Sequence, residues 1–250
     1  MTRVRILAPL VDLCDRPAGR RERQMLLGHQ AEVLAEAQVE AEGWSQLRAD
    51  LDGYVGWVPQ AALGPARPAT HVVSAPATHA YARADFKSPD RLSLSLGARL
   101  TVTGGEGRFA ETDQGFLPAG HLAPVTDHAA DPVTVAESLL GTPYLWGGNS
   151  RFGIDCSGLV QIACQRAGIA CPGDSGPQEA ALGHLLPPGT PWQRGDLLFW
   201  KGHVAWVRDA ETLLHANAWA MAVALEPIGA ALTRIDAQGD GPVTAHKRLT

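Results

Sequence analysis

The stretch PYLWGGNSRFGIDCSGLVQIACQRAG, residues 143–168, decides the fold of the C-terminal half of this 250-residue chain. Its second part predicts a helix that starts after Asp155, whose carboxylate can accept from the free backbone N–H groups of the first turn. Gly168 is expected to end that helix as a C-terminal cap. One helix face is apolar: Leu159, Val160, Ala163, Cys164 and Ala167. Cys156 therefore falls in the first turn of the predicted helix.

The start of a helix is an environment that favours a thiolate. Unpaired N–H groups and the positive end of the helix dipole can lower a thiol pKa well below its free value of about 8.5. A cysteine is more commonly a small buried apolar residue, which is the interpretation we give to Cys164. Cys156 differs from Cys164 in its position at the helix start and in its polar neighbours, and it is our candidate nucleophile.

Two histidines follow in strand-like segments and supply a candidate base. His203 opens the run Gly202–Val207, and His215 lies twelve residues later in Leu213–Asn217. The polar segment between the runs predicts a turn, so the two strands can form a hairpin with both imidazoles on one face. One imidazole would take the thiol proton while the other orients it. Either histidine alone is more commonly structural, but together with Cys156 they indicate a cysteine hydrolase.

The remaining C-terminal elements predict an α+β fold. Asp131 and Pro132 favour a helix over about Val133 to Leu140 that stops at Gly141. A loop rich in Pro and Gly is expected from Ala170 to Pro191. The chain then continues in strand-like runs: Asp196–Trp200, His203–Val207, Thr212–Ala218 and Ala222–Leu225.

The N-terminal half contains a repeat of about 60–70 residues. Gly56-Trp57-Val58-Pro59 followed by Leu63 is matched by Gly115-Phe116-Leu117-Pro118 followed by Leu122. Upstream, Leu27-Gly28 matches Leu96-Gly97, and Ala8-Pro9 matches Ala75-Pro76. Short strands are predicted throughout, including one with alternation at Val33, Ala35, Ala37 and Val39. Two tandem copies of one small β-barrel explain the pattern.

Composition excludes several classes of function. The formal net charge of −5 argues against a broad nucleic-acid surface. No segment approaches the roughly 20 apolar residues of a membrane span, and no secretory signal is recognisable, so a cytoplasmic protein is expected. The four cysteines form no CxxC pair and no zinc-binding spacing with histidine. We expect reduced thiols, no metal and no other cofactor.

An ordered set of motifs resembles the NlpC-type cell-wall peptidases: Tyr144-x-Trp146-Gly147-Gly148, Asp155-Cys156-Ser157-Gly158, Gly195-Asp196-Leu197 and Gly202-His203-Val204. The set covers residues 130–225. The resemblance implies a circularly rearranged papain-like fold, with His215 as the third catalytic residue. It also places Tyr144 beside the thiol, although a core aromatic with a polar tip is an alternative role for this residue.

The GWVP endings resemble bacterial SH3-like barrels. We therefore expect barrels at residues 1–66 and 67–126 and a papain-like catalytic domain at 127–250. Within the family, this arrangement is similar to the YkfC-type γ-D-glutamyl-L-diamino acid endopeptidases, which cleave muropeptides carrying a free N-terminal L-Ala.

That similarity implies a set of residues that bind the substrate. Asp174 and Ser175 would read the free amine of L-Ala, although an ordinary solvated turn is an alternative for Asp174. Tyr54 would close the substrate channel, and Glu22 would also reach the amine. The motif residues beside the thiol are further candidates: Asp155 and Ser157.

We thus expect a monomeric cysteine endopeptidase with a muropeptide substrate and no nucleic-acid or membrane partner. Two alternatives stay open at this point. One is an acyltransferase or amidase that uses the same thiol and histidine on the same fold. The other is a wall-binding protein in which the barrels carry the function and the third domain is inactive.

Overall fold

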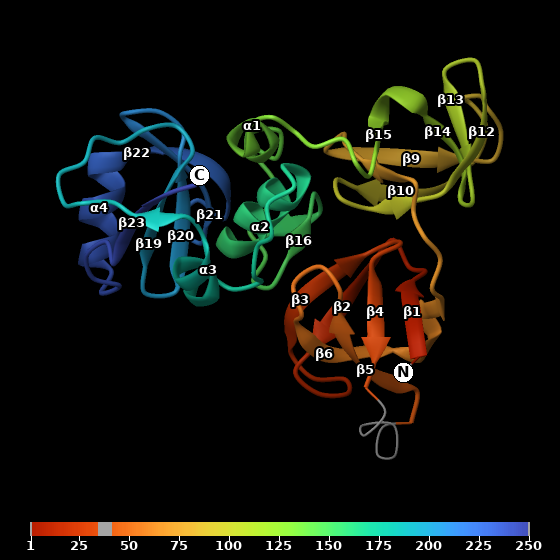
Figure 1. The fold of residues 1–250 in the computed structure, drawn as a ribbon, viewed down its shortest axis with the longest axis horizontal. Helices are drawn as coiled ribbons and strands as arrows, with labels where there is room; N and C mark the ends of the chain where they lie inside the picture. Colours follow the sequence, from red (N-terminus) through yellow and green to blue (C-terminus); the bar gives the residue numbers. More distant parts are fainter. Residues whose placement is uncertain (1, 35–41, 250) are drawn as a thin grey trace. The chain divides into compact units, whose positions relative to one another are not determined.

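The computed structural model describes residues 2–34 and 42–249. The chain forms two compact units. Unit 1 consists of Met1–His128 with Asn149–Arg151, and unit 2 consists of Ala129–Gly148 with Phe152–Thr250. Figure 1 colours most of unit 1 from red to yellow-green and unit 2 from green to blue. Within the described ranges, none of the helices has the length and apolar character needed to cross a membrane.

The first part of unit 1 is an antiparallel sheet of seven strands, in the order β3-β2-β6-β5-β4-β1-β7. The strands are β1 (Thr2–Ile6), β2 (Leu10–Cys14), β3 (Arg21–Leu26), β4 (Gln30–Val33), β5 (Trp44–Ala49), β6 (Val55–Pro59) and β7 (Leu63–Pro65). Their inward side chains form one core, which includes Ile6, Leu13, Leu47 and Val58. The strand expected to continue through Ala35, Ala37 and Val39 falls outside the described residues, and β4 ends at Val33.

The second part of unit 1 contains a five-stranded sheet, β10-β9-β14-β13-β12, and a three-stranded sheet, β11-β8-β15. The strands are β8 (His71–Val73), β9 (Ala77–Tyr81), β10 (Asp90–Ser95), β11 (Arg99–Leu100), β12 (Val102–Glu106), β13 (Phe109–Thr112), β14 (Gly115–Pro118) and β15 (Leu122–Pro124). Their core includes Val73, Leu94 and Leu117, and it also buries Leu26 and Leu27 from the first part.

The repeat read from the sequence adopts the same local structure twice. Strand β6 leads through a 3₁₀ turn, η2 (Gln60–Ala62), into β7, and strand β14 leads through η3 (Ala119–His121) into β15. The two glycines matched upstream also share a backbone conformation with positive φ, 76° at Gly28 and 91° at Gly97. A side chain on Gly28 would meet the carbonyl oxygen of Arg99 at 2.1 Å, so this position requires glycine on two grounds.

Unit 2 combines helices with an antiparallel sheet of six strands, in the order β18-β23-β19-β20-β21-β22. The sheet strands are β18 (His184–Leu185), β19 (Asp196–Trp200), β20 (His203–Val207), β21 (Thr212–Asn217), β22 (Ala222–Pro227) and β23 (Ala245–Arg248). The helices are α1 (Pro132–Glu137), α2 (Cys156–Arg166), α3 (Ser175–Ala181) and α4 (Ile228–Ala237), and two short strands are β16 (Asn149–Ser150) and β17 (Gly153–Ile154).

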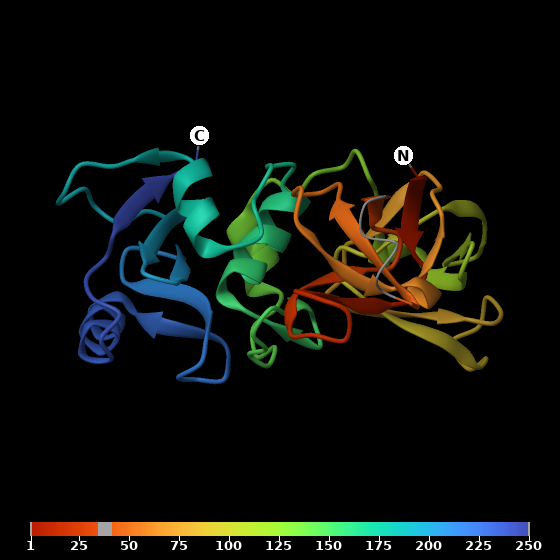
Figure 2. The ribbon, with the colours of Figure 1, turned by 90° about the horizontal axis from the view of Figure 1, so that it is seen from below.

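Helices cover both faces of this sheet. Helix α4 contributes Ile228, Ala231 and Ile235 to a core with side chains of β19, β20 and β21. Helix α2 packs against β20 and β21, and Figures 1 and 2 show α2 and α4 on opposite sides of the sheet. Strand side chains pointing to either face are consequently buried, so β20 and β21 are held firmly in place. This packing fixes the positions of His203 and His215.

Two sequence expectations for unit 2 were wrong, and two of its elements were not anticipated. Helix α1 ends at Glu137, before the expected Leu140, because the next residues form tighter i to i+3 turns: the Ser138, Leu139 and Leu140 N–H groups donate to Val135, Ala136 and Glu137 oxygens. Helix α3 lies inside the segment expected to be a loop, 170–191. Helix α4 and strand β23 follow the last predicted strand and were not anticipated.

Candidate active site

Asp155 fixes the start of α2 and with it the position of Cys156. Its Oδ1 accepts hydrogen bonds from the Gly158 N–H at 2.6 Å and from the Ser157 hydroxyl at 3.0 Å. Its Oδ2 accepts from the Gly147 N–H at 2.8 Å. The predicted N-cap is therefore present, and the carboxylate ties the first turn of the helix to the Trp146-Gly147 segment. The Asp155 and Ser157 side chains, expected to bind substrate, bond to each other and to the helix start.

The predicted hairpin is also present and brings two imidazoles together. Strands β20 and β21 pair antiparallel, with Trp206 opposite Leu214 and Val207 opposite Leu213. This register places His203 and His215 on the same face. The Nε2 atom of His203 lies 2.9 Å from Nδ1 of His215. His215 is fully buried, whereas His203 is partly exposed at the edge of a pocket.

Behind His215, a carboxylate and then a guanidinium extend the series of contacts that begins at His203. Nε2 of His215 lies 3.0 Å from Oε2 of Glu226, which is on the neighbouring strand β22. Arg234, on α4, donates to both carboxylate oxygens of Glu226, from Nε at 2.8 Å and from Nη2 at 2.7 Å. The hydrogen bonds from Arg234 and then His215 lower the pKa of Glu226 to about 2. Glu226 is therefore an anion at neutral pH.

Cys156 and His203 open onto one pocket of about 360 Å³ within unit 2. Tyr144 lines the same pocket, half-buried, and burial raises the pKa of its hydroxyl to about 12, with smaller contributions from Cys156 and Asp155. The other residues that line the pocket are Lys201, Gly202, Asn217, Ala218, Trp219, Arg234, Ile235, Gln238 and Asp240. The pocket thus gives a substrate access to the thiol and the imidazole together.

The electrostatics of the thiol differ from the sequence expectation. Burial raises the pKa of Cys156 to about 12, and the neighbouring Asp155 carboxylate adds to the increase. N–H groups of Val204, Ser157 and Cys156 itself act in the opposite direction but do not offset burial. Burial lowers the pKa of His203 to about 3, and the electrostatic influence of the neighbouring His215 and Arg234 adds to the decrease. The resting pair is therefore a neutral thiol beside a neutral imidazole, and the expected lowering of the thiol pKa was wrong.

The residues expected to read the substrate amine lie elsewhere. Asp174 is exposed at the N-cap of α3, and Ser175 is the first residue of that helix. The lining of the thiol pocket includes neither of these described residues. Their assignment to an amine subsite stays a prediction.

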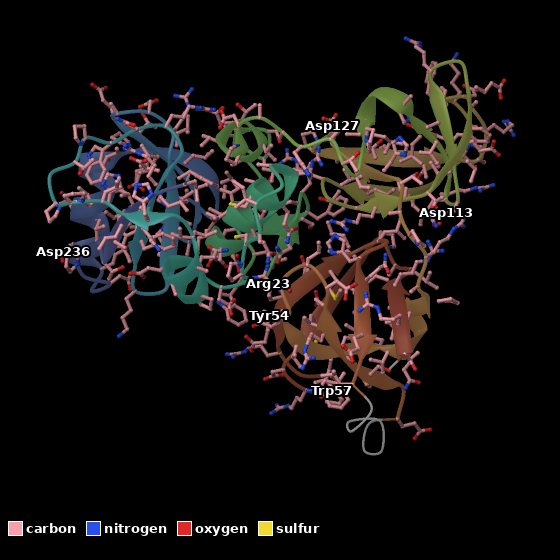
Figure 3. The ribbon with its side chains drawn as sticks, in the orientation of Figure 1. Arg23, Tyr54, Trp57, Asp113, Asp127 and Asp236 are labelled. Carbon is pink, nitrogen blue, oxygen red and sulfur yellow. The ribbon has the colours of Figure 1, made fainter. Side chains whose placement is uncertain are left out.

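Tyr54 and Glu22 belong to unit 1. The guanidinium of Arg23 lies over the Tyr54 ring, 5.5 Å from its centroid, and Figure 3 labels both side chains. Glu22 accepts hydrogen bonds from Nη2 of Arg20 at 2.8 Å and from Nε at 3.1 Å. A role for either residue in substrate binding also stays a prediction.

Glu226 and Arg234 are the site residues that sequence reasoning missed. Glu226 directly follows the expected strand Ala222–Leu225; in the structure it belongs to β22 and lies opposite Leu213. Extending the strand-pairing argument by one strand would have placed its carboxylate on the face of His215. Arg234 could not be found in this way, because helix α4 itself was not anticipated. Across residues 2–34 and 42–249, no three His, Cys, Asp or Glu side chains are grouped to bind a metal ion.

Comparison with known proteins identifies the family. Residues 141–231 match the model of the NlpC/P60 family, and residues 13–63 match the bacterial dipeptidyl-peptidase Sh3 domain. Residues 141–231 are thus an NlpC/P60 domain. The match covers α2, β19, β20 and β21 and therefore Cys156, His203 and His215. The predicted family and the predicted enzyme class, a cysteine peptidase, are confirmed.

Two curated relatives carry the same name, gamma-D-glutamyl-L-lysine dipeptidyl-peptidase. The protein of Bacillus cereus is 26% identical over 84% of this chain and 72% of its own length. That of Bacillus subtilis is 31% identical over 61% of this chain, which spans about half of the relative (53%). The crystal structure of an NlpC/P60 family protein from Bacillus cereus superposes with a TM-score of 0.80 over 99% of both chains, at 20% identity, and supports the fold.

Proposed function

We propose that this NlpC/P60 chain hydrolyses the bond between γ-D-glutamate and a diamino acid in peptidoglycan-derived peptides that carry a free N-terminal L-Ala. The observation that carries the proposal is the pocket that exposes Cys156 beside His203, with His215 hydrogen-bonded behind the base. The names of the two Bacillus relatives support the choice of bond.

In the proposed reaction, the sulfur of Cys156 attacks the γ-carbonyl carbon of D-glutamate while its proton passes to Nδ1 of His203. The other ring nitrogen of His203 is engaged with His215, so Nδ1 is the one left for the thiol. The new C–S bond gives a tetrahedral oxyanion, which the Tyr144 hydroxyl at the same pocket can stabilise. The imidazolium then gives its proton to the amide nitrogen, the C–N bond breaks and the diamino acid leaves.

Water completes the cycle. Nδ1 of His203 removes a proton from a water molecule as its oxygen attacks the thioester carbon. The C–O bond forms, the C–S bond breaks, and the thiol regains its proton from the imidazolium. The products are the dipeptide L-Ala-D-Glu, with its γ-carboxylate free, and the free diamino acid. Because the resting thiol is neutral, proton transfer to His203 must accompany the attack.

The finer organisation of the chain belongs to the same proposal. The strand, 3₁₀ turn and strand that occur in both parts of unit 1 support two SH3-like barrels, at residues 1–66 and 67–126. Residues 127–250 would be the catalytic domain, in the circularly rearranged papain-like order, with the thiol helix α2 ahead of the histidine strands. A monomer that recycles murein peptides in the cytoplasm is the expected setting, and size measurement and cell fractionation can check it.

A free amine is the proposed specificity signal, and Asp174 is the proposed partner of that amine. A charge-assisted contact contributes about 1.5–3 kcal/mol, so Asp174→Ala should lower kcat/KM ten-fold to a hundred-fold. The matched control is Asp236→Ala, which removes an exposed carboxylate of the same unit that does not line the thiol pocket (Figure 3 labels Asp236).

The deciding experiment is mass spectrometry of digests of free and N-acetylated L-Ala-γ-D-Glu-diaminopimelate, with the L-lysine peptide run in parallel. Cleavage of the free peptides between D-glutamate and the diamino acid, at least ten-fold faster than of the acetylated one, is expected. Equal rates for free and acetylated peptides would contradict the free-amine requirement. Absence of cleavage with all of them would contradict the proposed bond specificity.

A further inference from the structure

A line of four side chains runs from the pocket into unit 2, and each member comes from a different element. His203 is on β20, His215 on β21, Glu226 on β22 and Arg234 on α4. The successive contacts measure 2.9 Å between the imidazoles, 3.0 Å from His215 to Glu226, and 2.7 and 2.8 Å from Glu226 to Arg234. Nothing in the chemistry proposed above requires the last two members.

At the Arg234 end of this line of side chains, the hydrogen-bond donors and acceptors are fixed. A guanidinium only donates hydrogen bonds and keeps its proton in proteins. Arg234 therefore presents N–H groups to both oxygens of Glu226, and the carboxylate it faces is ionised. An ionised carboxylate only accepts. The 3.0 Å contact with His215 must consequently be a donation from the Nε2–H of His215 to Oε2 of Glu226.

This donation determines the hydrogen positions in the rest of the line. A neutral imidazole has one N–H and one lone pair, so a His215 protonated at Nε2 offers its lone pair at Nδ1. Nδ1 of His215 then accepts from Nε2–H of His203 across 2.9 Å. A neutral His203 protonated at Nε2 has its own lone pair at Nδ1. That nitrogen is the one the reaction needs as the base for Cys156.

From this geometry we infer that Glu226 is a positioning residue that sets the tautomers of both histidines, and that Arg234 holds it in the acceptor state. The inference rests on the proposed function only for its kinetic consequence. Without the carboxylate, the guanidinium of Arg234 could itself donate to Nε2 of His215. His215 would then carry its proton on Nδ1 and donate to His203, whose proton would move to the nitrogen facing the thiol.

The groups around the histidine pair come from every element that packs against it. Glu226 on β22 and Arg234 on α4 are the charged groups behind His215. On the pocket side are Cys156 on α2, Tyr144, and the charged residues Lys201 and Asp240. Asp155 precedes Cys156 in the chain, but its two carboxylate oxygens accept hydrogen bonds from the Gly158 and Gly147 N–H groups at the helix start. Of these groups, only Glu226 is hydrogen-bonded to His215 and ionised as an acceptor.

The test compares Glu226→Ala, Glu226→Gln and Glu226→Asp with a matched control, Asp196→Asn. Asp196 forms a second carboxylate cluster in the same sheet, with His246 at 2.7 Å and Arg248 at 2.6 and 2.8 Å. It does not line the thiol pocket. Its substitution should disturb the sheet without changing the tautomers of the catalytic histidines.

The direct measurement is the ¹⁵N chemical shift of each imidazole nitrogen at neutral pH, with resonances assigned by single histidine substitutions. In the unaltered chain, we expect Nε2 to be protonated and Nδ1 unprotonated in both His203 and His215. Glu226→Ala should shift both rings toward the Nδ1–H form, and Glu226→Asp should keep the original form. This measurement needs no substrate, so it stands or fails independently of the bond that the enzyme cleaves.

The kinetic measurement is kcat/KM on the free peptide. Glu226→Ala should lower it by about 10²-fold or more, since a wrong tautomer withdraws the base, and Glu226→Asp should restore most of the loss. Glu226→Gln should lie between them, because an amide can present either an oxygen or an NH₂ group to His215. If Glu226→Ala does not fold, the isosteric Glu226→Gln carries the test and should show a measurable Nδ1–H population in His215.

Three results would overturn the inference. The first is unchanged imidazole shifts in a folded Glu226→Ala or Glu226→Gln variant. The second is a loss of kcat/KM below about threefold in folded Glu226→Ala. The third is an equal loss in Asp196→Asn, which would mean that any buried carboxylate of the sheet has the same effect on activity through stability alone.

Discussion

At two places on the six-stranded sheet of unit 2, the same three residue types meet: an acid, a histidine and an arginine. At one place Asp196 accepts from Arg248 at 2.6 and 2.8 Å and contacts His246 at 2.7 Å. At the other place Glu226 accepts from Arg234 and contacts His215. The chemistry of the two clusters is nearly identical. What differs is what lies next to each histidine.

His246 packs on Trp192, with ring centroids 4.5 Å apart, and the line of polar groups ends there. In the other cluster, Nδ1 of His215 contacts Nε2 of His203, and His203 lines the pocket together with Cys156. The first cluster therefore links β19 to β23. The second sets the tautomer of the imidazole that acts as the base for the thiol. The comparison teaches that residue type and hydrogen bonding alone do not mark a catalytic group. A catalytic group is marked by a series of contacts that leads to a nucleophile in an accessible pocket.

The largest effect should come from removing the nucleophile that makes the two clusters unequal. Cys156→Ser should abolish peptide cleavage while the fold is kept, because a hydroxyl has a far higher pKa and His203 would not ionise it. The measurement is the rate of product release, with circular dichroism to check folding. Cys164→Ala on the same helix is the control and should cost only packing, since Cys164 is fully buried. Activity above a few per cent in Cys156→Ser would remove this thiol from the mechanism.

The next largest difference should separate His203 from His246. His203→Ala should lower kcat/KM by at least about 10³-fold, because it removes both the base and the proton donor. His246→Ala, which breaks the second cluster, should stay within about threefold of the unaltered rate at a temperature where both variants are folded. Similar losses in the two variants would place the effect in sheet stability and not in proton transfer.

A smaller effect is expected at His215. His215→Asn should retain measurable activity, because the amide oxygen can still accept from His203 Nε2–H. We expect a loss of about 10- to 100-fold in kcat/KM, less than that of His203→Ala. His215→Ala, which offers no acceptor, should lose more than His215→Asn. A complete loss in His215→Asn, equal to that of His203→Ala, would mean that His215 does more than orient the base.

The last comparison concerns the contribution of the two carboxylates to folding stability. Burial alone would raise the pKa of Asp196, but the hydrogen bonds from Arg248 and His246 outweigh it and lower that pKa. Asp196 has no exposed surface, so Asp196→Asn should lower the free energy of unfolding by about 3–5 kcal/mol. Glu226 is 16% exposed, and Glu226→Gln should cost about 1–2 kcal/mol. Urea unfolding at pH 7 gives both values.

The pH dependence of stability sharpens this last comparison. A carboxyl group whose pKa is lowered in the folded state stabilises the fold above its unfolded pKa, and this stabilisation is lost as pH falls through the folded value. For Glu226 that window extends from about pH 4.5 down to about 2. Urea unfolding between pH 7 and 3 should therefore show a loss of stability below about pH 4.5 that is shallower in Glu226→Gln. Parallel curves for the two proteins would contradict the lowered pKa.

The local chemistry of the site could be predicted from sequence because it depends on short spacings. Asp155 next to Cys156 is enough to place the thiol at a helix start, and a separation of twelve positions between two histidines is enough for a hairpin with both on one face. The repeated GWVP and GFLP endings likewise form the same strand and 3₁₀ turn twice, since each carries its own turn residues. Helix α4 was missed because no element was predicted beyond Leu225.

The sequence by itself determined the nucleophile candidate, the hairpin of the histidines and the family motifs, because each is encoded within a few neighbouring residues. Only the tertiary structure decided the state of the thiol and the partner of His215. Burial, which depends on how α2, the sheet and α4 pack, raises the pKa of Cys156 and outweighs the helix start. Glu226 and Arg234 reach His215 from a neighbouring strand and a covering helix, and such contacts arise only when the packed sheet brings separate segments together.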